Sequence, residues 1–311
     1  MHVFRQQARQ PPVTVYDRKT GDMFDEPILG DHLLRLTCRN YLGALPRLAL
    51  FRSHCISRVL GWYADSRWSR HAVNSAIRQL HIDVSEFAQP VEQYRTFNEF
   101  FTRCLRKGTR PYNPAPNEFC APADSRVLVF PSVDALSCFP VKGVRFNISR
   151  LLKGADNETT DIHGGSVAVF RLSPADCHRF YYPASGRVLT ERQIPGGLAP
   201  VNIMALRRRA DVYTSNTRYV SMVEFDGFGR AAFVEVGAFA VGRIVHTHND
   251  RTFTKMDEKG YFEFGGSTIV VVLRPGCIEF DADLAQNTLN GYETRILAGQ
   301  RVGCLFAPDR A

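Results

Sequence analysis

The stretch Phe264-Gly265-Gly266-Ser267-Thr268-Ile269-Val270-Val271-Val272-Leu273 joins two glycines and a serine to a run of mostly β-branched residues. Glycines allow backbone conformations that a Cβ disfavours, and the apolar run is typical of a buried strand. The pattern predicts a serine hydroxyl on a tight turn at the start of a rigid strand. There it could attack a nearby carbonyl, including that of its own preceding peptide bond. Gly-Gly-Ser is also common in plain hairpin turns, so both interpretations stay open at this point.

Composition narrows the class of protein. The chain has 311 residues, of which 44% are hydrophobic and 23% charged, and these values are typical of soluble globular domains. It has no run of about 18 or more apolar residues and no apolar secretory signal at its start, so neither a spanning helix nor export is expected. The eight cysteines form no Cys-x-x-Cys pair. This argues against a zinc site and favours reduced thiols in the cytosol.

The chain is basic, with a formal net charge of +8. Such a charge attracts nucleic acid or an anionic membrane surface. No nucleic-acid-binding motif is present, so a nucleic-acid partner is not expected. An anionic membrane partner and a simply soluble basic surface both remain compatible with the charge.

The first third of the chain is predicted to be irregular over residues 1–27 and helical over 28–115. Apolar residues recur at helical spacing through 28–85, with arginines and histidines between them. Three aromatic residues lie in the same stretch: Trp62, Tyr63 and Trp68. A basic amphipathic helix of this kind is a candidate for lying in a membrane interface. Packing of the helix on its own domain is the alternative.

A second helix is predicted over 91–106, because Gly108 and Pro111 follow it as a stop signal. From residue 116 to 311, short apolar runs alternate with Gly, Pro and Asp turns, which predicts a β-rich catalytic core. The predicted strands are 127–130, 166–172, 231–236, 238–244, 268–273 and 277–280. The predicted fold class is therefore α+β, with an N-terminal helical, membrane-associating region followed by an antiparallel β-rich core.

Two six-residue segments within this core resemble each other. They are Pro122-Ala-Asp-Ser-Arg-Val127 and Pro183-Ala-Ser-Gly-Arg-Val188. A match of this length can arise by chance; otherwise it predicts two related β-units, each built around the same turn-to-strand corner.

Three polar side chains occur in turn contexts: Asp124, His178 and Ser267. An acid, an imidazole and a hydroxyl are the parts of an activated nucleophile, in which the acid orients the base and the base removes the hydroxyl proton. Each also has a structural explanation, because an aspartate can stabilise a turn and a histidine can be a half-buried, hydrogen-bonded imidazole. The sequence does not show whether the three meet in space.

A series of longer motifs runs in order along the chain. It includes Tyr16-Asp-Arg-Lys-Thr-Gly21, Phe97-Asn-Glu-Phe-Phe-Thr-Arg103, Ala121-Pro-Ala-Asp124, Phe170-Arg-Leu-Ser-Pro-Ala-Asp-Cys-His-Arg-Phe180 and Gly260-Tyr-Phe-Glu-Phe-Gly-Gly-Ser-Thr268. One such match would be weak, but several in the same order are specific. Over nearly its whole length the chain resembles the phosphatidylserine decarboxylase family.

The resemblance implies a self-processing proenzyme. Ser267 would attack the carbonyl of Gly266, and β-elimination followed by hydrolysis would leave a covalent pyruvoyl group on the new N-terminus. The chain would be divided into residues 1–266 and 267–311. The pyruvoyl cofactor would form a Schiff base with the amine of phosphatidylserine and accept electrons as CO2 leaves, giving phosphatidylethanolamine. No metal is implied.

The resemblance also implies roles for the polar residues. Asp124 matches the acid of the self-cleavage machinery, and His178 matches the first histidine of the family motif, which assists decarboxylation or protonation. The family's second histidine, the base for self-cleavage, is replaced here by Tyr181. Tyrosine has a pKa of about 10 against about 6.5 for histidine and is a poor base at neutral pH. Either His178 takes over, or another imidazole (His163, His246 or His248) reaches the site, or the chain stays uncleaved.

Three functions are compatible with these observations. The first is a phosphatidylserine decarboxylase, peripheral on the cytoplasmic side of a bacterial-type cell membrane, with a phospholipid substrate and a homodimer of cleaved chains. The second is a pyruvoyl-dependent decarboxylase of a free amino acid such as tryptophan. The third is an unprocessed lipid-binding protein that keeps the fold, which the replacement at Tyr181 would explain.

Overall fold

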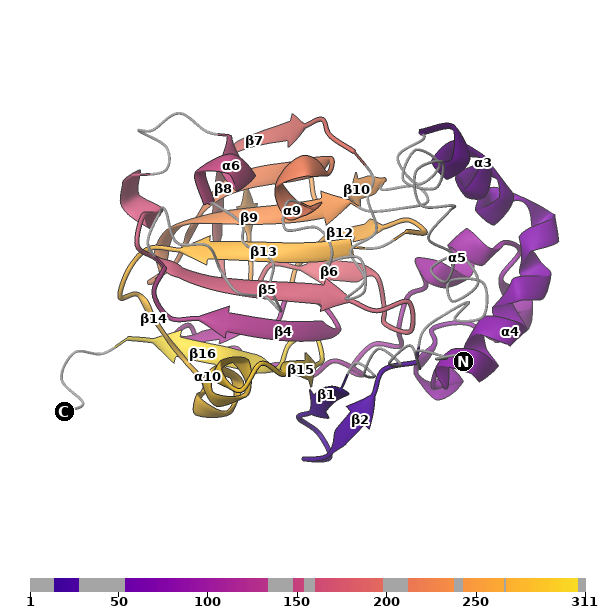
Figure 1. The fold of residues 1–311 in the computed structure, drawn as a ribbon, viewed down its shortest axis with the longest axis horizontal. Helices are drawn as coiled ribbons and strands as arrows, with labels where there is room; N and C mark the ends of the chain where they lie inside the picture. Colours follow the sequence, from indigo (N-terminus) through magenta and orange to yellow (C-terminus); the bar gives the residue numbers. More distant parts are fainter. Residues whose placement is uncertain are drawn as a thin grey trace, which may run out of the picture.

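The computed structural model describes residues 14–27, 54–133, 148–153, 160–197, 212–237, 243–265 and 267–306. These residues form a mixed α+β structure around a ten-stranded sheet, with two three-stranded sheets and several helices packed against it (Figure 1). The predicted combination of helices with a β-rich core is confirmed.

The central sheet contains β1 (Thr14–Asp17), β2 (Met23–Asp25), β4 (Ser125–Phe130), β5 (Ser166–Leu172), β7 (Gly186–Ile194), β8 (Arg218–Phe225), β9 (Gly229–Gly237), β11 (Thr252–Phe253), β13 (Ser267–Leu273) and β15 (Glu293–Ile296). Its order is β11-β7-β8-β9-β13-β5-β4-β15-β1-β2. Neighbouring strands are antiparallel except β1 and β15, which are parallel. The core is therefore antiparallel, as predicted, apart from this one pair.

Two smaller sheets flank the central one. One contains β10 (Ile244–His246), β12 (Glu258–Phe262) and β6 (Arg179–Tyr181), and the other contains β14 (Ile278–Phe280), β16 (Arg301–Leu305) and β3 (Glu118–Cys120). The α-helices are α3 (His54–Asp65), α4 (Arg70–Leu80), α5 (Phe97–Phe101), α6 (Ile148–Leu152), α9 (Val212–Ser215) and α10 (Ala282–Leu289). Short 3-10 turns are η2 (Arg67–Ser69), η3 (Val84–Glu86), η4 (Val91–Gln93) and η5 (Thr160–Ile162).

Strand β13 is buried on both of its faces. Ile269 and Val271 pack in the core beneath the small sheet of β6, β10 and β12, whereas Val270 and Val272 pack in a second core with residues of α6 and α9. A strand covered on both faces needs apolar residues at every position. This requirement explains the unbroken run Ile269–Leu273, which predicted the strand.

Residues 14–25 differ from the prediction. They were expected to be irregular, but β1 and β2 form a hairpin, and β1 lies beside β15 with Val15 fully buried. Strands of three and four residues have too short a pattern to be recognised locally. Their alignment comes from pairing with a strand almost 280 residues away, with Val15 opposite Glu293.

The predicted helices are shorter than expected. Instead of one helix over 91–106, the structure has the turn η4 and then α5. Thr96 starts α5 by accepting a hydrogen bond from the Glu99 backbone amide, and the chain soon becomes extended because Leu105 bridges to Phe87. In the stretch 28–85, α3 and α4 are helical as predicted, while 28–53 lies outside the described residues. In the predicted strand 238–244 only 243 and 244 are described, and β10 begins at Ile244.

The two similar six-residue segments lie side by side. Strands β4 and β7 both begin three residues after the proline of their segment. The Tyr181 amide donates to Pro122 O at 2.8 Å, and the Cys120 amide donates to Pro183 O at 3.0 Å. The proline carbonyl of each segment therefore accepts a hydrogen bond from the chain just before the other segment. These bonds bring the Asp124 segment next to Tyr181.

Helices α3 and α4 lie to one side of the sheets (Figure 1). Among the described residues, no helix is long and apolar enough to cross a membrane. Large apolar side chains are nevertheless exposed here, with Trp62 74% and Trp68 80% accessible.

A buried ion pair joins β12 of the small sheet to β9 of the central sheet. Lys259 Nζ lies 2.7 Å from Glu235 Oε1, and the two side chains are 1% and 0% exposed. The ammonium also lies 5.5–5.9 Å from the ring centres of Tyr182, Tyr219 and Phe233. Burial alone would raise the pKa of Glu235, but Lys259 and His246 together outweigh this effect and hold the pKa below its ordinary value.

The substitution Lys259→Met keeps much of the side-chain volume but leaves the Glu235 carboxylate buried without its lysine. Removing one partner of a buried ion pair costs about 3–5 kcal/mol, so we expect a loss of that size in the free energy of unfolding, measured by urea denaturation. The control is Arg187→Met, which breaks an exposed pair with Glu224 and should cost less than about 1 kcal/mol. Equal losses in the two variants would contradict the importance of burial.

Candidate active site

Ser267 is the first residue of β13 and is fully buried. It lies opposite Leu172 of β5 on one side and Gly237 of β9 on the other. Its Oγ has no hydrogen-bond partner among the described residues. Gly266, the expected cleavage position, lies outside the described residues. A buried hydroxyl without a partner costs about 1–3 kcal/mol, which suits a reacting group better than a structural one.

His178 follows β5 by six residues and is also buried. Its ring stacks on Phe101, with ring centres 3.7 Å apart, and its Nδ1 lies 3.1 Å from the backbone oxygen of Asp176. Because a carbonyl can only accept, Nδ1 carries the proton and Nε2 keeps its lone pair. Burial lowers the pKa of His178 to about 3, against a smaller opposing effect of Asp176. His178 is therefore neutral at pH 7, with a lone pair on Nε2.

Helix α5 holds His178 and the segment before Ser267 at the same end of the sheet. Phe101 stacks on His178 on one side and meets the Phe264 ring edge-on at 5.3 Å. The Phe264 amide donates to Asn98 Oδ1 at 3.0 Å, and the Phe262 amide donates to His178 O at 2.9 Å. The helix motif of the sequence is therefore part of the site.

Asp124 is buried, and both of its oxygens are occupied. Arg110 donates to Oδ1 from Nε at 2.7 Å and to Oδ2 from Nη2 at 2.6 Å, and the Ala298 amide donates to Oδ1 at 2.9 Å. Arg110 also bonds Glu86 at 2.8 Å. The carboxylate is clamped by a planar guanidinium, the strongest geometry for such a pair, and among the described residues it makes no hydrogen bond to His178 or Ser267.

Tyr181 and Cys177 lie near Asp124 and are both protonated at neutral pH. Burial raises the pKa of Tyr181 further above its ordinary value, and the negative charges of Glu258 and Asp124 add to this effect. Burial likewise raises the pKa of Cys177 to about 11, and its Sγ donates to Arg103 O at 3.5 Å. Tyr181 is therefore no base here, and Cys177 is a thiol rather than a reactive thiolate.

The other histidines lie at different distances from Ser267. His163 precedes β5, whose first residue pairs with Leu273, so it lies at the far end of β13, roughly 20 Å away. His248 bonds Thr252 O at 2.9 Å, next to strand β11 at the sheet edge. His246 Nε2 lies 3.4 Å from Glu235 Oε1. Since Glu235 pairs with Ile269, His246 lies over the same face as Ser267.

The structure therefore brings Ser267 and His178 to one end of the sheet and places Asp124 with Tyr181 beside them. The sequence did not reveal the anchoring residues: Arg110 on Asp124, and Arg126 on Asp176. Arg126 and Asp176 stand in quoted segments, and Arg110 stands between Gly108 and Pro111, the stop signal of the predicted helix. A count of charged residues in those stretches could have singled them out, although not their pairing.

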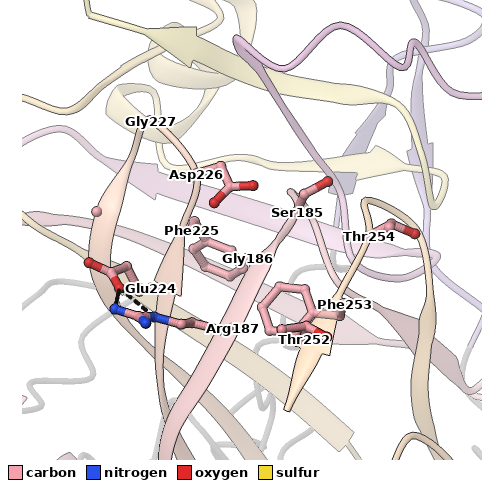
Figure 2. Close-up of a pocket in the computed structure, with 11 residues that line it drawn as sticks. Ser185, Gly186, Arg187, Glu224, Phe225, Asp226, Gly227, Thr252, Phe253 and Thr254 are labelled. Atoms are coloured by element: carbon pink, nitrogen blue, oxygen red, sulfur yellow. Dashed lines mark hydrogen bonds and ion pairs between the residues drawn. The ribbon is translucent and has the colours of Figure 1, made fainter. Parts of the chain in front are cut away.

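Two of the pockets in the described part of the chain differ in their distance from Ser267. The larger, about 820 Å³, is lined by residues such as Ser185, Asp226 and Thr254. Figure 2 shows the Phe225 and Phe253 rings inside it. Phe225 pairs with Gly229, at the end of β9 far from Gly237, so this pocket is remote from Ser267. The second, about 720 Å³, is lined partly by Thr102, Arg103 and Arg179, which flank Phe101 and His178, and it adjoins the site.

Comparisons with known proteins agree with the motifs. The sequence model of a family described as phosphatidylserine decarboxylase matches residues 97–304. A protein of Chlamydia felis named phosphatidylserine decarboxylase proenzyme is 35% identical over 288 residues, covering 92% of this chain and 96% of the relative. One of the same name from Ruminiclostridium cellulolyticum is 32% identical over 292 residues, covering 94% and 97%.

The neutral state of buried His178 predicts a pH-dependent stability. An unfolded histidine titrates near 6.5, so as pH falls from there towards 3 the unfolded chain binds a proton that the folded chain does not. The contribution is complete above pH 6.5 and is lost as pH falls. Between pH 7 and pH 5 the wild type should lose about 2 kcal/mol relative to His178→Gln, measured by urea denaturation. A difference between the two proteins that is the same at both pH values would contradict this.

Proposed function

The chain belongs to the phosphatidylserine decarboxylase family, and on that premise we propose that it converts phosphatidylserine to phosphatidylethanolamine and CO2 after cleaving itself at Ser267. The observation that carries the proposal is the buried, unpartnered Ser267 hydroxyl at the start of β13, at the same end of the sheet as a neutral His178. A free-amino-acid decarboxylase would share the chemistry, but the curated relatives act, by their names, on phosphatidylserine.

The proposed self-cleavage uses this chain's own residues. Ser267 Oγ attacks the carbonyl carbon of Gly266 and displaces its own amide nitrogen, which converts the peptide bond into an ester. Loss of the Ser267 α-proton then expels the Gly266 carboxylate, and water hydrolyses the resulting dehydroalanine to a pyruvoyl group with release of ammonia. The products are residues 1–266 and 267–311.

We assign the proton transfers of self-cleavage to His178 rather than to Tyr181. His178 has a fixed Nδ1–H and an Nε2 lone pair, and its backbone is tied to Phe262, five residues before Ser267. Tyr181 has a raised pKa and keeps its proton. Asp124 is proposed as a positioning residue, because its pairing with Arg110 fixes the corner that packs against Tyr181.

The same residues serve the decarboxylation. A pyruvoyl group at position 267 supplies the electron sink for loss of CO2. The buried site excludes water around this position, and His178 holds or returns a proton at Nε2. The pocket lined by Thr102, Arg103 and Arg179 offers the adjoining space for a substrate.

The helical region is proposed to rest peripherally on the cytoplasmic side of a bacterial-type cell membrane, where a phospholipid substrate resides. The exposed Trp62 and Trp68, the exposed Val59 and the basic composition of the chain support this. We also propose the division into a helical region of 28–115 and a catalytic core of 116–311, and a homodimer of cleaved chains.

Self-cleavage is tested by denaturing gel and intact mass. We expect the wild type to give two chains that separate at Gly266–Ser267, and Ser267→Ala to stay intact. His178→Gln should slow cleavage by about 10²–10⁴-fold, the usual contribution of a general base, whereas His246→Gln should cleave like the wild type.

Tyr181→His restores the family's second histidine as a complementary test. Faster cleavage would show that a base is limiting in the wild type. An uncut wild type after prolonged incubation would overturn the proposal and favour the lipid-binding protein. Loss of cleavage in His246→Gln with retention in His178→Gln would move the base to the imidazole beside Glu235.

Membrane contact is tested by sedimentation with vesicles containing an anionic lipid. The double substitution Trp62→Ala and Trp68→Ala removes two large exposed rings, and binding should weaken roughly tenfold or more. Leu289→Ala is the matched control, because Leu289 is 81% exposed on α10, outside the helical region. Equal weakening in both would contradict a membrane face on α3 and η2.

A further inference from the structure

A network of five buried charged side chains lies beneath the end of β13 that begins at Ser267. Its members are Glu26, Arg126, Arg171, Asp176 and Glu293, and their side chains are between 3% and 8% exposed. Arg171 lies opposite Thr268, and Arg126 lies opposite Arg171. Residues directly opposite share a face of the sheet, so the two arginines point to the face opposite that of Ser267.

Glu26 joins the two arginines. Its Oε1 lies 2.6 Å from Arg126 Nε and its Oε2 lies 2.7 Å from Arg171 Nη2. Glu293 holds the other side of Arg171 with two bonds, of 3.0 and 2.8 Å. Burial would raise the pKa of Glu26, but Arg171 and Arg126 outweigh it and hold the pKa below its ordinary value. Glu26 is therefore ionised and lies between the guanidinium groups of Arg126 and Arg171.

A continuous chain of contacts leads from Glu26 to His178. Arg126 Nη1 bonds Asp176 Oδ2, which also accepts from the Ser173 amide at 2.7 Å. The backbone oxygen of the same Asp176 accepts from His178 Nδ1 at 3.1 Å. The position of Arg126 thus sets the turn 173–176, and that turn supplies the acceptor that fixes the tautomer of His178.

Glu26 reaches this network from a distant part of the chain. It follows β2, and the hairpin of β1 and β2 is attached to the sheet through β15 (Figure 1). Arg18 holds the hairpin to the C-terminal part through Asp281 at 2.6 Å and Asp283 at 2.7 Å. Residues 97–304, matched by the family model, do not include Glu26.

We propose that Glu26 is a positioning residue for His178, acting through Arg126 and Asp176, so that the N-terminal hairpin is part of the reacting site. This inference rests on the proposed function only in taking His178 as the group that receives the Ser267 proton. A glutamine at this position is neutral: its oxygen can still accept from Arg171, but the charge that pairs with Arg126 is lost and an N–H can face that guanidinium. Arg126 then keeps only Asp176 of its two carboxylate partners and shifts, and with it the acceptor of His178.

The first experiment compares self-cleavage rates of the wild type, Glu26→Gln and Asp25→Asn. Asp25 is the matched control, because it is an exposed neighbour whose side chain accepts a hydrogen bond from the Thr14 hydroxyl and takes no part in the network. Displacement of a reacting group by about 1 Å can cost about 10²-fold in rate. We therefore expect Glu26→Gln to cleave about tenfold slower or more, and Asp25→Asn to match the wild type. In the cleaved enzyme, kcat should fall with KM unchanged.

A second readout does not depend on activity. In the uncleavable Ser267→Ala background, ¹⁵N NMR of labelled histidines reports the tautomer of His178. We expect an Nδ1–H tautomer, and we expect Glu26→Gln to weaken this preference while Asp25→Asn leaves it unchanged. If Glu26→Gln fails to fold, Glu26→Asp keeps the charge but shortens the reach by one methylene, and it should give the same change to a smaller extent.

The outcomes distinguish the positioning role of Glu26 from the proposed function of the chain. An unchanged His178 tautomer together with an unchanged cleavage rate in Glu26→Gln would overturn the positioning role and leave the proposed function standing. An uncut wild type would overturn the proposed function, while the tautomer measurement would still decide whether Glu26 positions His178.

Discussion

Strand β13 is held by backbone pairing with a neighbouring strand on each side, and this pairing includes its first residue, Ser267. All seven of its residues pair with β5 on one side and with β9 on the other. A slip by one residue would turn each apolar side chain to the wrong core. The position of Ser267 Oγ is therefore fixed by the packing of the residues behind it. The same ladders would hold the strand in place after a cleavage, and β15 and β16, which follow Ser267 in the sequence, are bonded to β4 and β3, which precede it.

Buried arginines serve this site as anchors for carboxylates. Arg110 pairs with the carboxylate of Asp124, and Arg126 pairs with the carboxylate of Asp176. A carboxylate taken out of water needs a cation and further donors, and removing either partner is costly. Each arginine therefore fixes the turn that carries its aspartate. The consequence is a rigid frame around His178, whose own ring stays neutral because burial lowers its pKa.

The elements that the sequence predicted best are those whose pattern is complete within a few residues. The runs at 166–172 and 268–273 match β5 and β13 almost to the residue, because burial on both faces requires apolar side chains throughout. The motifs also predicted Ser267, His178 and Asp124 as site residues; the structure places them at one end of the sheet, and their roles stay a prediction. The hairpin of β1 and β2 could not be predicted in this way, since β1 gains its partner from β15 at the other end of the chain. Pairings such as Glu26 with Arg126 are equally non-local.

The presence of a tyrosine at position 181, in place of the family's second histidine, agrees with the hydrogen bonding of the Asp124 carboxylate. The family's second histidine would stand beside a carboxylate whose two oxygens are here bound by Arg110 and by the Ala298 amide. An imidazole at that position would need one of those oxygens in order to be oriented and to hold a proton. The phenol of Tyr181, whose pKa burial raises, stays protonated and does not need an Asp124 oxygen that Arg110 or the Ala298 amide already holds. If His178 carries the proton transfers, as proposed, their pH dependence rests on its imidazole and on the backbone oxygen of Asp176 that fixes its tautomer.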